Sequence, residues 1–172
     1  VNITWNESID YNGQLSIKGS NIEELEQELL RHPYINKKPP KSTGRKEFGS
    51  SMINHIITKY NKCDNHDILR TLVRFTAKSI WINLEKYLKF DRSNCNFYVN
   101  GGGYHHPILM KDLKKYINIG SHIDLQTIGI HQDNKEALLI AILALCKYLD
   151  IPSNMSSVTG SKGDIILGDI LV

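Results

Sequence analysis

Hydrophobic residues recur at helical spacing through the first half of the chain. The clearest amphipathic pattern runs over about residues 67–88, where apolar side chains return every three or four positions. A shorter pattern begins after Ser20, which has the spacing of a capping box with Glu23, and it ends at Pro33. We expect an extended polar segment over residues 1–19, before the first helix. A further helix is predicted after the proline-rich loop, with these residues facing inward: Phe48, Met52, Ile56 and Ile57.

The second half alternates short apolar strands with helices. The helix predicted over residues 134–149 is apolar nearly all round, which indicates burial. Alternating strands and helices favour an α/β domain whose sheet is covered by helices. The predicted elements are a strand over 95–99, a glycine turn over 100–103, a helix from Pro107 to Tyr116, a strand over 122–127, the helix over 134–149 and a strand over 165–172.

Composition and charge exclude several classes of protein. The chain has 172 residues, enough for one domain with its own core, and a net charge of +3 that is scattered along the sequence. We therefore expect no nucleic-acid surface. The longest apolar run, Ala137 to Cys146, is too short to span a bilayer. The three cysteines lie far apart without metal-ligand spacing, which is typical of reduced thiols in a cytoplasmic protein.

Three consecutive glycines stand where a predicted strand passes into a predicted helix. Gly101, Gly102 and Gly103 would let the backbone approach a ligand closely, and the helix start would present free N–H groups to it. A nucleotide cradle and a plain tight turn explain this pattern about equally well.

A second candidate lies in the loop PPKSTGR, where two cations and two hydroxyls surround one glycine. Charge-assisted hydrogen bonds from such a group could hold phosphate. The local pattern favours a solvated loop instead, because the glycine-rich lead of a P-loop is absent. The residues concerned are Lys41, Ser42, Thr43, Gly44 and Arg45.

A single carboxylate, Glu136, stands in the first turn of the most apolar predicted helix. A sugar hydroxyl could donate a hydrogen bond to it. Stabilisation of the helix start by a negative charge is the simpler explanation.

The histidines and serines do not form a recognisable metal or hydrolase motif. Spacings among His105, His106, His122 and His131 match no closed zinc site. No serine lies in a nucleophile-elbow pattern. We predict neither a metal site nor a Ser-His-Asp centre in this chain.

Four blocks along nearly the whole chain carry a resemblance to a known family. They are Asp10-Tyr11-Asn12-Gly13, then His32 to Phe48, then Asn100 to Met110, and finally Asp133 to Ala144 followed by Pro152, Ser157 to Gly160 and Leu167-Gly168. As an ordered set they resemble the anhydro-N-acetylmuramic acid kinase family, which includes fungal levoglucosan kinases. Three departures are a charge reversal at Lys46, Asn12 in place of an aspartate, and His106 in place of an asparagine.

The resemblance implies a fold, a reaction and a set of site residues. The fold would be the second lobe of an actin/hexokinase-like (ribonuclease H-like) sugar kinase, occupying residues 1–172 and incomplete at its N-terminal side. The reaction would use ATP and Mg²⁺ to phosphorylate a 1,6-anhydro sugar while water opens the anhydro ring, as in peptidoglycan recycling and amino sugar metabolism. Glu136 would hold the sugar. The cofactor would contact Gly101, Gly102, Gly103, Lys41, Ser42, Thr43 and Gly44.

The family's glycine-rich phosphate loop and its Gly-Pro-Gly-Asn segment with the general base have no counterpart in this sequence and are expected upstream of residue 1. We therefore predict a chain that is inactive alone and works with a missing N-terminal half or a complementary chain, as a possible homodimer, with no nucleic acid or membrane partner. The alternative is a remnant kinase lobe that serves as a non-catalytic binding module. The sequence does not distinguish anhydro-N-acetylmuramic acid from levoglucosan as the sugar.

Overall fold

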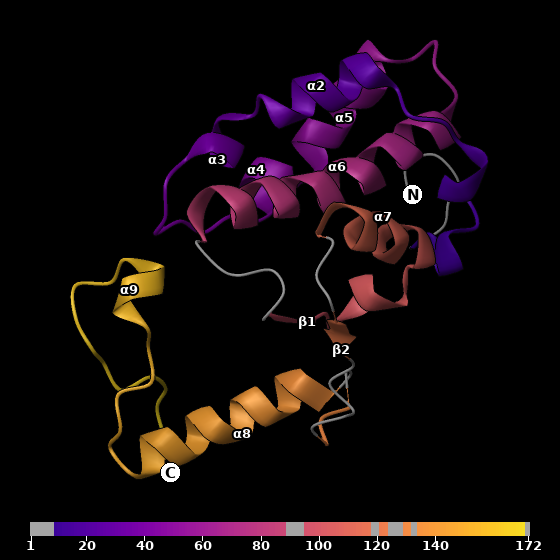
Figure 1. Cartoon of the computed structure of the whole chain (residues 1–172). Coiled ribbons are helices and arrows are strands. Elements are labelled where there is room, and N and C mark those ends of the chain that lie inside the picture. Colours follow the sequence, from indigo (N-terminus) through magenta and orange to yellow (C-terminus); the bar gives the residue numbers. More distant parts are fainter. Residues whose placement is uncertain (1–8, 89–94, 118–120, 124–128, 132–133, 171–172) are drawn as a thin grey trace. The chain divides into compact units, whose positions relative to one another are not determined.

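The computed structural model divides the chain into two compact units (Figure 1). Unit 1 comprises residues 1–37 and 43–123, and unit 2 comprises residues 38–42 and 124–172. Within these units the structure describes residues 9–88, 95–117, 121–123, 129–131 and 134–170.

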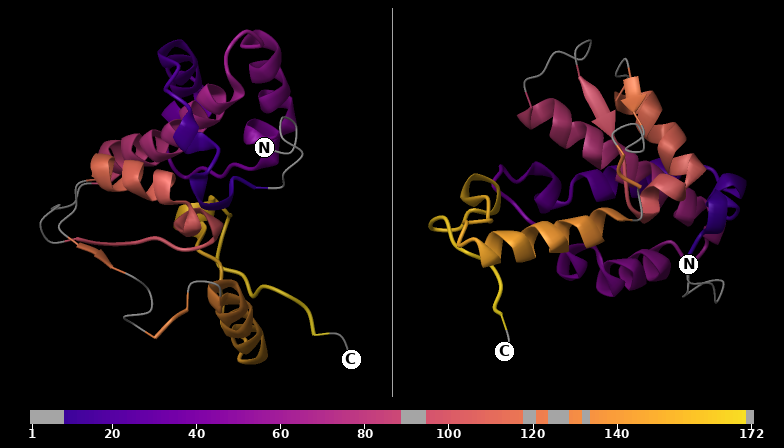
Figure 2. Two further views of the ribbon diagram at one scale, coloured as in Figure 1. Left: turned by 90° about the vertical axis from the view of Figure 1, so that its right-hand side faces the viewer. Right: turned by 90° about the horizontal axis from the view of Figure 1, so that it is seen from below.

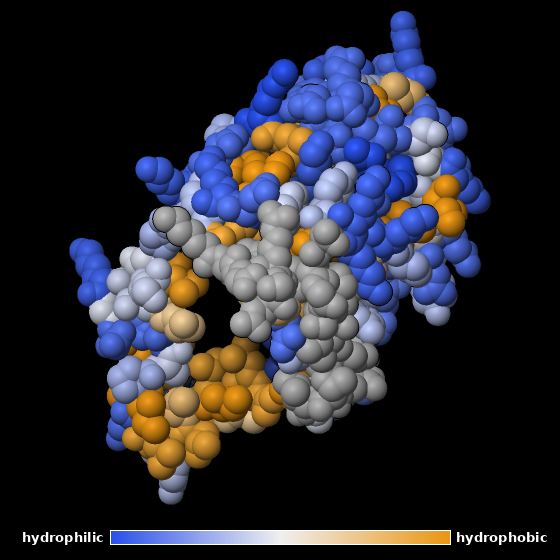
Figure 3. Space-filling view, viewed as in Figure 1, coloured by the Kyte–Doolittle hydropathy of each residue, from blue (hydrophilic) through white to orange (hydrophobic). Residues whose placement is uncertain are grey.

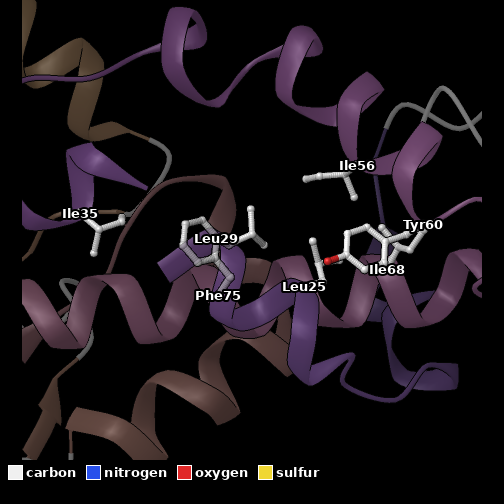
Figure 4. Packing of buried hydrophobic residues seen from close by; sticks show 7 residues of the cluster. All are labelled: Leu25, Leu29, Ile35, Ile56, Tyr60, Ile68 and Phe75. Atoms are coloured by element: carbon white, nitrogen blue, oxygen red, sulfur yellow. The ribbon is translucent and has the colours of Figure 1, made fainter. Parts of the chain in front are cut away.

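Unit 1 is built around the long helix α6, Asn65–Tyr87. Its N-cap is Asp64, whose carboxylate accepts a hydrogen bond of 2.7 Å from the backbone N–H of His66. Helices α2, Glu23–Leu30, and α5, Ser50–Lys59, supply apolar side chains to the same core. The buried cluster shown in Figure 4 consists of Leu25, Leu29, Ile35, Ile56, Tyr60, Ile68 and Phe75. These contacts confirm the predicted amphipathic helix over residues 67–88 and the inward positions of Ile56, Phe48 and Met52, whereas Ile57 is only half-buried. The single helix predicted for these four residues is divided at Gly49 into α4 and α5.

Helix α7, Pro107–Ile117, packs against α6 and buries a second cluster (Figures 1 and 2). Ala77, Leu113 and Ile117 form this cluster. A bidentate ion pair also joins the two helices: Arg70 donates to both carboxylate oxygens of Asp112, at 2.6 and 3.0 Å. The helix begins at Pro107, as predicted, because proline needs no hydrogen-bond acceptor in the first turn.

The two strands that flank α7 form a parallel pair. β1, Asn96–Tyr98, pairs with β2, Ser121–Ile123, in the register Asn96↔Ser121, Phe97↔His122 and Tyr98↔Ile123. A parallel pair connected by a helix is a β-α-β unit. It agrees with the predicted order of elements, although residues 124–127 of the predicted strand lie outside the described residues.

The predicted boundaries of the first helices are wrong. Helix α2 begins at Glu23 without a side-chain cap, and the backbone N–H of Ser20 donates to Asp67 of α6 at 2.6 Å. The capping box fails because a tertiary contact with α6 occupies the segment that would have formed it. Pro33 does not end α2, which stops at Leu30, but begins the short helix α3, Pro33–Asn36, with His32 as its N-cap.

The leading segment is not extended where the structure describes it. It forms two 3₁₀ turns, η1 at Tyr11–Gly13 and η2 at Ser16–Lys18, and η2 contacts α6. The predicted proline-rich loop leads into the short helix α4, Arg45–Phe48.

Unit 2 contains the apolar helix α8, Lys135–Tyr148, and the predicted burial of this helix is wrong. Its described side chains include none that is buried, and Ile140 and Leu145 are 64% and 57% exposed. Figure 3 shows the resulting apolar surface in orange over this helix, near the bottom of the view. None of the helices formed by the described residues is long and apolar enough to cross a membrane.

The C-terminal segment of unit 2 is a loop that hydrogen bonds of the Asn154 side chain stabilise. It contains the short helix α9, Ser156–Thr159, and no strand over residues 165–170, so the predicted C-terminal strand is wrong there. The side chain of Asn154 accepts from the backbone N–H of Ile165 at 2.7 Å and donates to the carbonyl of Gly163 at 2.7 Å. These bonds use backbone groups that a strand would need for pairing.

Candidate functional site

A pocket of about 570 Å³ lies in unit 1 where the leading segment meets the start of α7. One side comes from the turn that contains η1. The other comes from η4, Gly102–His105, and from the first turn of α7. The residues that line it are Ile9, Asp10, Tyr11, Asn12, Gly102, Gly103, His105, His106 and Leu109.

The two sides of the pocket are joined by a hydrogen bond between residues 96 positions apart in sequence. His106 Nε2 lies 3.1 Å from Asp10 Oδ2, and the two side chains are only 17% and 5% exposed. His106 Nδ1 accepts a bond of 3.2 Å from the backbone N–H of Leu109, in the first turn of α7. His106 therefore contacts the leading segment and caps a helix with opposite edges of one ring.

Asp10 organises its own turn. Its two carboxylate oxygens accept backbone N–H bonds from Leu15, at 2.8 Å, and from Ser16, at 3.1 Å. Burial on its own would raise the pKa of the Asp10 carboxyl, but hydrogen bonds from Ser16, Leu15 and His106 outweigh burial and lower that pKa below its usual range. Asp10 is consequently a carboxylate at neutral pH.

Two glycines adopt backbone conformations that shape the pocket. Gly101 has φ 79° and ψ −177°, a region that only glycine adopts readily, and it leads the chain from β1 into η4. Gly13, with φ 68°, ends the Asp10 turn, and a Cβ atom there would lie 2.7 Å from Ile108 and 3.2 Å from the ring of His106. The close approach of the two pocket walls thus depends on a glycine at position 13.

The glycines predicted as a nucleotide cradle lie at this pocket. Gly102 and Gly103 line it, and Gly101 is the residue immediately before η4. Of the predicted loop residues, Thr43 and Gly44 belong to unit 1, where the carbonyl of Gly44 accepts hydrogen bonds from Glu47 and Phe48 at the start of α4. They do not line the pocket.

The remaining predicted site residues belong to unit 2. Glu136 is exposed in the first turn of α8. Lys41 and Ser42 follow Pro40, which lies against Gly160: a Cβ atom at Gly160 would be 3.5 Å from the Pro40 ring. The proline-rich loop and the Ser157 to Gly160 block, distant in sequence, therefore meet within unit 2.

Sequence reasoning did not select Asp10, Tyr11 or His106 as site residues. The signal that could find them is a pairing of two blocks, Asp10 to Gly13 and Asn100 to Met110, which the resemblance places in order along the chain but not in contact. His106 was noted as a departure from an asparagine. The geometry shows why a histidine is accommodated there, since its Nδ1 accepts the helix-start N–H as a side-chain amide oxygen would.

Comparison with known proteins identifies the family. A sequence model described as anhydro-N-acetylmuramic acid kinase matches residues 1–172, the whole chain. The chain therefore belongs to the anhydro-N-acetylmuramic acid kinase family.

Curated relatives of the same description agree with this assignment. The chain is 33% identical over 166 residues to an anhydro-N-acetylmuramic acid kinase of Clostridioides difficile, a match that covers 96% of this chain and 43% of that protein. It is 34% identical over 171 residues to the kinase of Francisella tularensis subsp. novicida, covering 99% and 44%, respectively. The chain thus spans less than half the length of these relatives.

Proposed function

We propose that the chain is the C-terminal part of an enzyme that uses ATP to phosphorylate a 1,6-anhydro sugar while water opens the anhydro ring. Its place in the kinase family supports the reaction class. The pocket between the Asp10 turn and the glycine block is the observation that carries the proposal for this part of the enzyme. Anhydro-N-acetylmuramic acid and levoglucosan are the two candidate sugars.

The pocket suits the nucleoside part of ATP. It has glycine backbone on one wall, the apolar side chains of Ile9 and Leu109, and the 64%-exposed ring of Tyr11, on which a base could stack. No Lys or Arg is among the residues that line it, so we assign the phosphates to a region beyond its mouth. Gly102 leaves the pocket wall open, because nothing lies within 4 Å of the place where its side chain would begin.

Other residues of the chain serve the remaining parts of the reaction in this proposal. Glu136 accepts hydrogen bonds from the sugar, and Lys41 to Gly44 contact the cofactor. The general base that activates the water comes from a segment upstream of residue 1. This chain then contributes binding and positioning, which are the main sources of catalysis in phosphoryl transfer.

Mg²⁺ would enter with the nucleotide. The described residues contain no group of three His, Cys, Asp or Glu side chains that could hold a metal ion. Mg²⁺ in kinases usually keeps several waters and binds substrate phosphates with one or two carboxylates, so a dedicated protein cluster is not required. When bound, it would neutralise charge on the phosphates.

This part of the enzyme would work with the missing N-terminal half, which would belong either to the same polypeptide or to a complementary chain. The complete protein would be cytoplasmic and could form a homodimer. The second candidate function is a non-catalytic kinase lobe that binds another protein. The exposed apolar side chains of α8 favour a surface that another polypeptide covers.

A calorimetric titration of the 172-residue chain with ADP tests the nucleotide pocket. We expect measurable binding that weakens at least tenfold in Gly102→Val, which fills the pocket wall. Gly163→Val is the matched control, because Gly163 also has nothing within 4 Å of its Cβ position and lies in unit 2. Absence of ADP binding to the unmodified chain, or equal binding by both variants, would contradict the proposal and favour the non-catalytic lobe.

A further inference from the structure

The hydrogen bond between His106 and Asp10 joins the two walls of the candidate pocket. Asp10 belongs to the leading turn, and His106 stands between η4 and α7. Each side chain also accepts a hydrogen bond from a backbone N–H of its own wall, Asp10 from Leu15 and His106 from Leu109. The pair therefore joins two segments that are each stabilised by local hydrogen bonds.

The hydrogen bonds around the imidazole fix its tautomer. Nδ1 accepts from the backbone N–H of Leu109 and therefore carries no proton. The ring proton of the neutral form is then on Nε2, which donates to Asp10 Oδ2 at 3.1 Å. The Asp10 carboxylate also accepts hydrogen bonds from the backbone N–H groups of Leu15 and Ser16.

The surrounding packing leaves the ring little freedom. Gly13 brings its backbone so close that a Cβ atom would lie 3.2 Å from His106 Cε1. The side chain of His106 is 17% exposed and that of Asp10 is 5% exposed. A side chain of different reach at position 106 would therefore change the separation of the pocket walls.

We propose that His106 is a positioning residue, which sets the spacing of the nucleotide pocket by donating from Nε2 to Asp10 while Nδ1 caps α7. The inference rests on the proposed nucleotide site. It assigns the two nitrogens different tasks: Nε2 governs ligand affinity, and Nδ1 governs the stability of the helix start.

Two amide substitutions separate these tasks. The amide nitrogen of glutamine reaches about as far from the backbone as Nε2, so His106→Gln retains a donor for Asp10 but no acceptor for Leu109. The amide oxygen of asparagine lies where Nδ1 lies, so His106→Asn retains the helix cap but falls short of Asp10.

The test measures ADP affinity and thermal stability for the full chain and both variants. We expect His106→Gln to bind ADP within about threefold of the unmodified chain but to melt at a lower temperature. His106→Asn restores the residue that the family resemblance leads one to expect, but in this chain its amide falls short of Asp10, so it should lose at least tenfold in affinity and keep its melting temperature more closely. An effect on packing alone would instead move both quantities together in both variants.

A second measurement does not depend on nucleotide. Long-range proton–nitrogen correlation spectra of the imidazole should show His106 protonated at Nε2 and not at Nδ1 near neutral pH. An Nδ1–H tautomer, or affinity that falls equally in the glutamine and asparagine variants, would overturn the inference while leaving the nucleotide pocket supported. Absence of ADP binding by the unmodified chain would overturn the proposed site itself.

Discussion

At the scale of single residues, the absence of a side chain at position 13 determines how closely the pocket walls approach. Gly13→Ala combines a positive φ with a Cβ atom 2.7 Å from Ile108, so we expect a loss of about 2–4 kcal/mol of unfolding free energy. Denaturant unfolding monitored by circular dichroism would measure it.

Gly44→Ala is the matched control for this substitution. Gly44 has φ −170°, which any residue adopts, and nothing lies within 4 Å of its Cβ position. Its replacement should change the unfolding free energy by less than about 0.5 kcal/mol. Equal stability of the two alanine variants would show that Gly13 does not sit in a close contact.

The Asp10 carboxylate gives a pH dependence with a definite sign. Its pKa is lowered in the folded chain, so its contribution to stability is present above the unfolded pKa of about 3.9 and is lost as pH falls through the lower folded value. The stability of the unmodified chain should therefore fall more steeply below about pH 4 than that of Asp10→Asn. Parallel stability curves from pH 7 to pH 3 would mean that the hydrogen bonds to Asp10 are not maintained in solution.

Substitution of Glu136 distinguishes a residue that binds the sugar from one that only stabilises the start of α8 by its charge. In a polypeptide that joins this chain to the N-terminal half of a family member, Glu136→Gln should lower kcat/KM at least tenfold if the carboxylate binds the sugar, since a hydrogen bond to a charged group contributes about 1.5–3 kcal/mol. A helix-dipole role would instead cost a few tenths to about 1 kcal/mol of stability. Steady-state kinetics and melting temperatures measured together separate the two roles.

At the scale of secondary-structure elements, the ion pair between Arg70 and Asp112 holds α7 on α6. Both side chains are largely buried, at 19% and 10% exposed, and the pair is bidentate. Asp112→Ala would leave a buried guanidinium unpaired, and we expect it to cost about 3–5 kcal/mol. Arg70→Met combined with Asp112→Leu should lose much less, because no charge remains buried.

Lys59→Ala provides the surface control for this comparison. Lys59 pairs with Glu28 at 2.6 Å, but the two side chains are 45% and 35% exposed. Its loss should cost much less than the loss of Asp112, because water screens an exposed pair. A cost for Asp112→Ala no larger than that for Lys59→Ala would contradict a buried pair.

Elements with a long repeating pattern were predictable, whereas their ends depended on tertiary contacts. The apolar periodicity of α6 was sufficient to predict that helix, and Pro107 was sufficient to predict where α7 begins. The capping box at Ser20 failed because its backbone N–H bonds Asp67, which no local pattern encodes. The burial predicted for α8 followed from its composition, yet burial also requires a neighbour, and the described residues of the chain leave Ile140 and Leu145 exposed.

The candidate site was only partly predictable for the same reason. The three glycines were visible as a strand-to-helix turn with a possible ligand. The contribution of Asp10 and His106 required knowledge that residues 96 positions apart meet, and a single sequence does not encode that pairing in any local pattern.

At the scale of the whole molecule, we expect no kinase turnover from the 172-residue chain alone. The residues that line the pocket offer contacts to the nucleoside, but none of them is proposed as the general base that activates water. Loss of positioned acid–base and electrostatic groups costs several powers of ten in rate. ADP release with ATP and either 1,6-anhydro-N-acetylmuramic acid or levoglucosan would measure it. Turnover clearly above a protein-free control would place the complete catalytic machinery within these residues.

Helix α6 contacts η2 and α2, which precede it along the chain, and α7, which follows it. Contacts between nearby segments close at a lower entropic cost than distant ones, and helix-rich topologies accordingly fold fast. We expect α2 and α7 to collapse onto α6 early in folding. The parallel pairing of β1 with β2 would come later, because it needs the intervening α7 to be in place. The pocket, which depends on the segment between β1 and α7, would then be among the last parts of unit 1 to form.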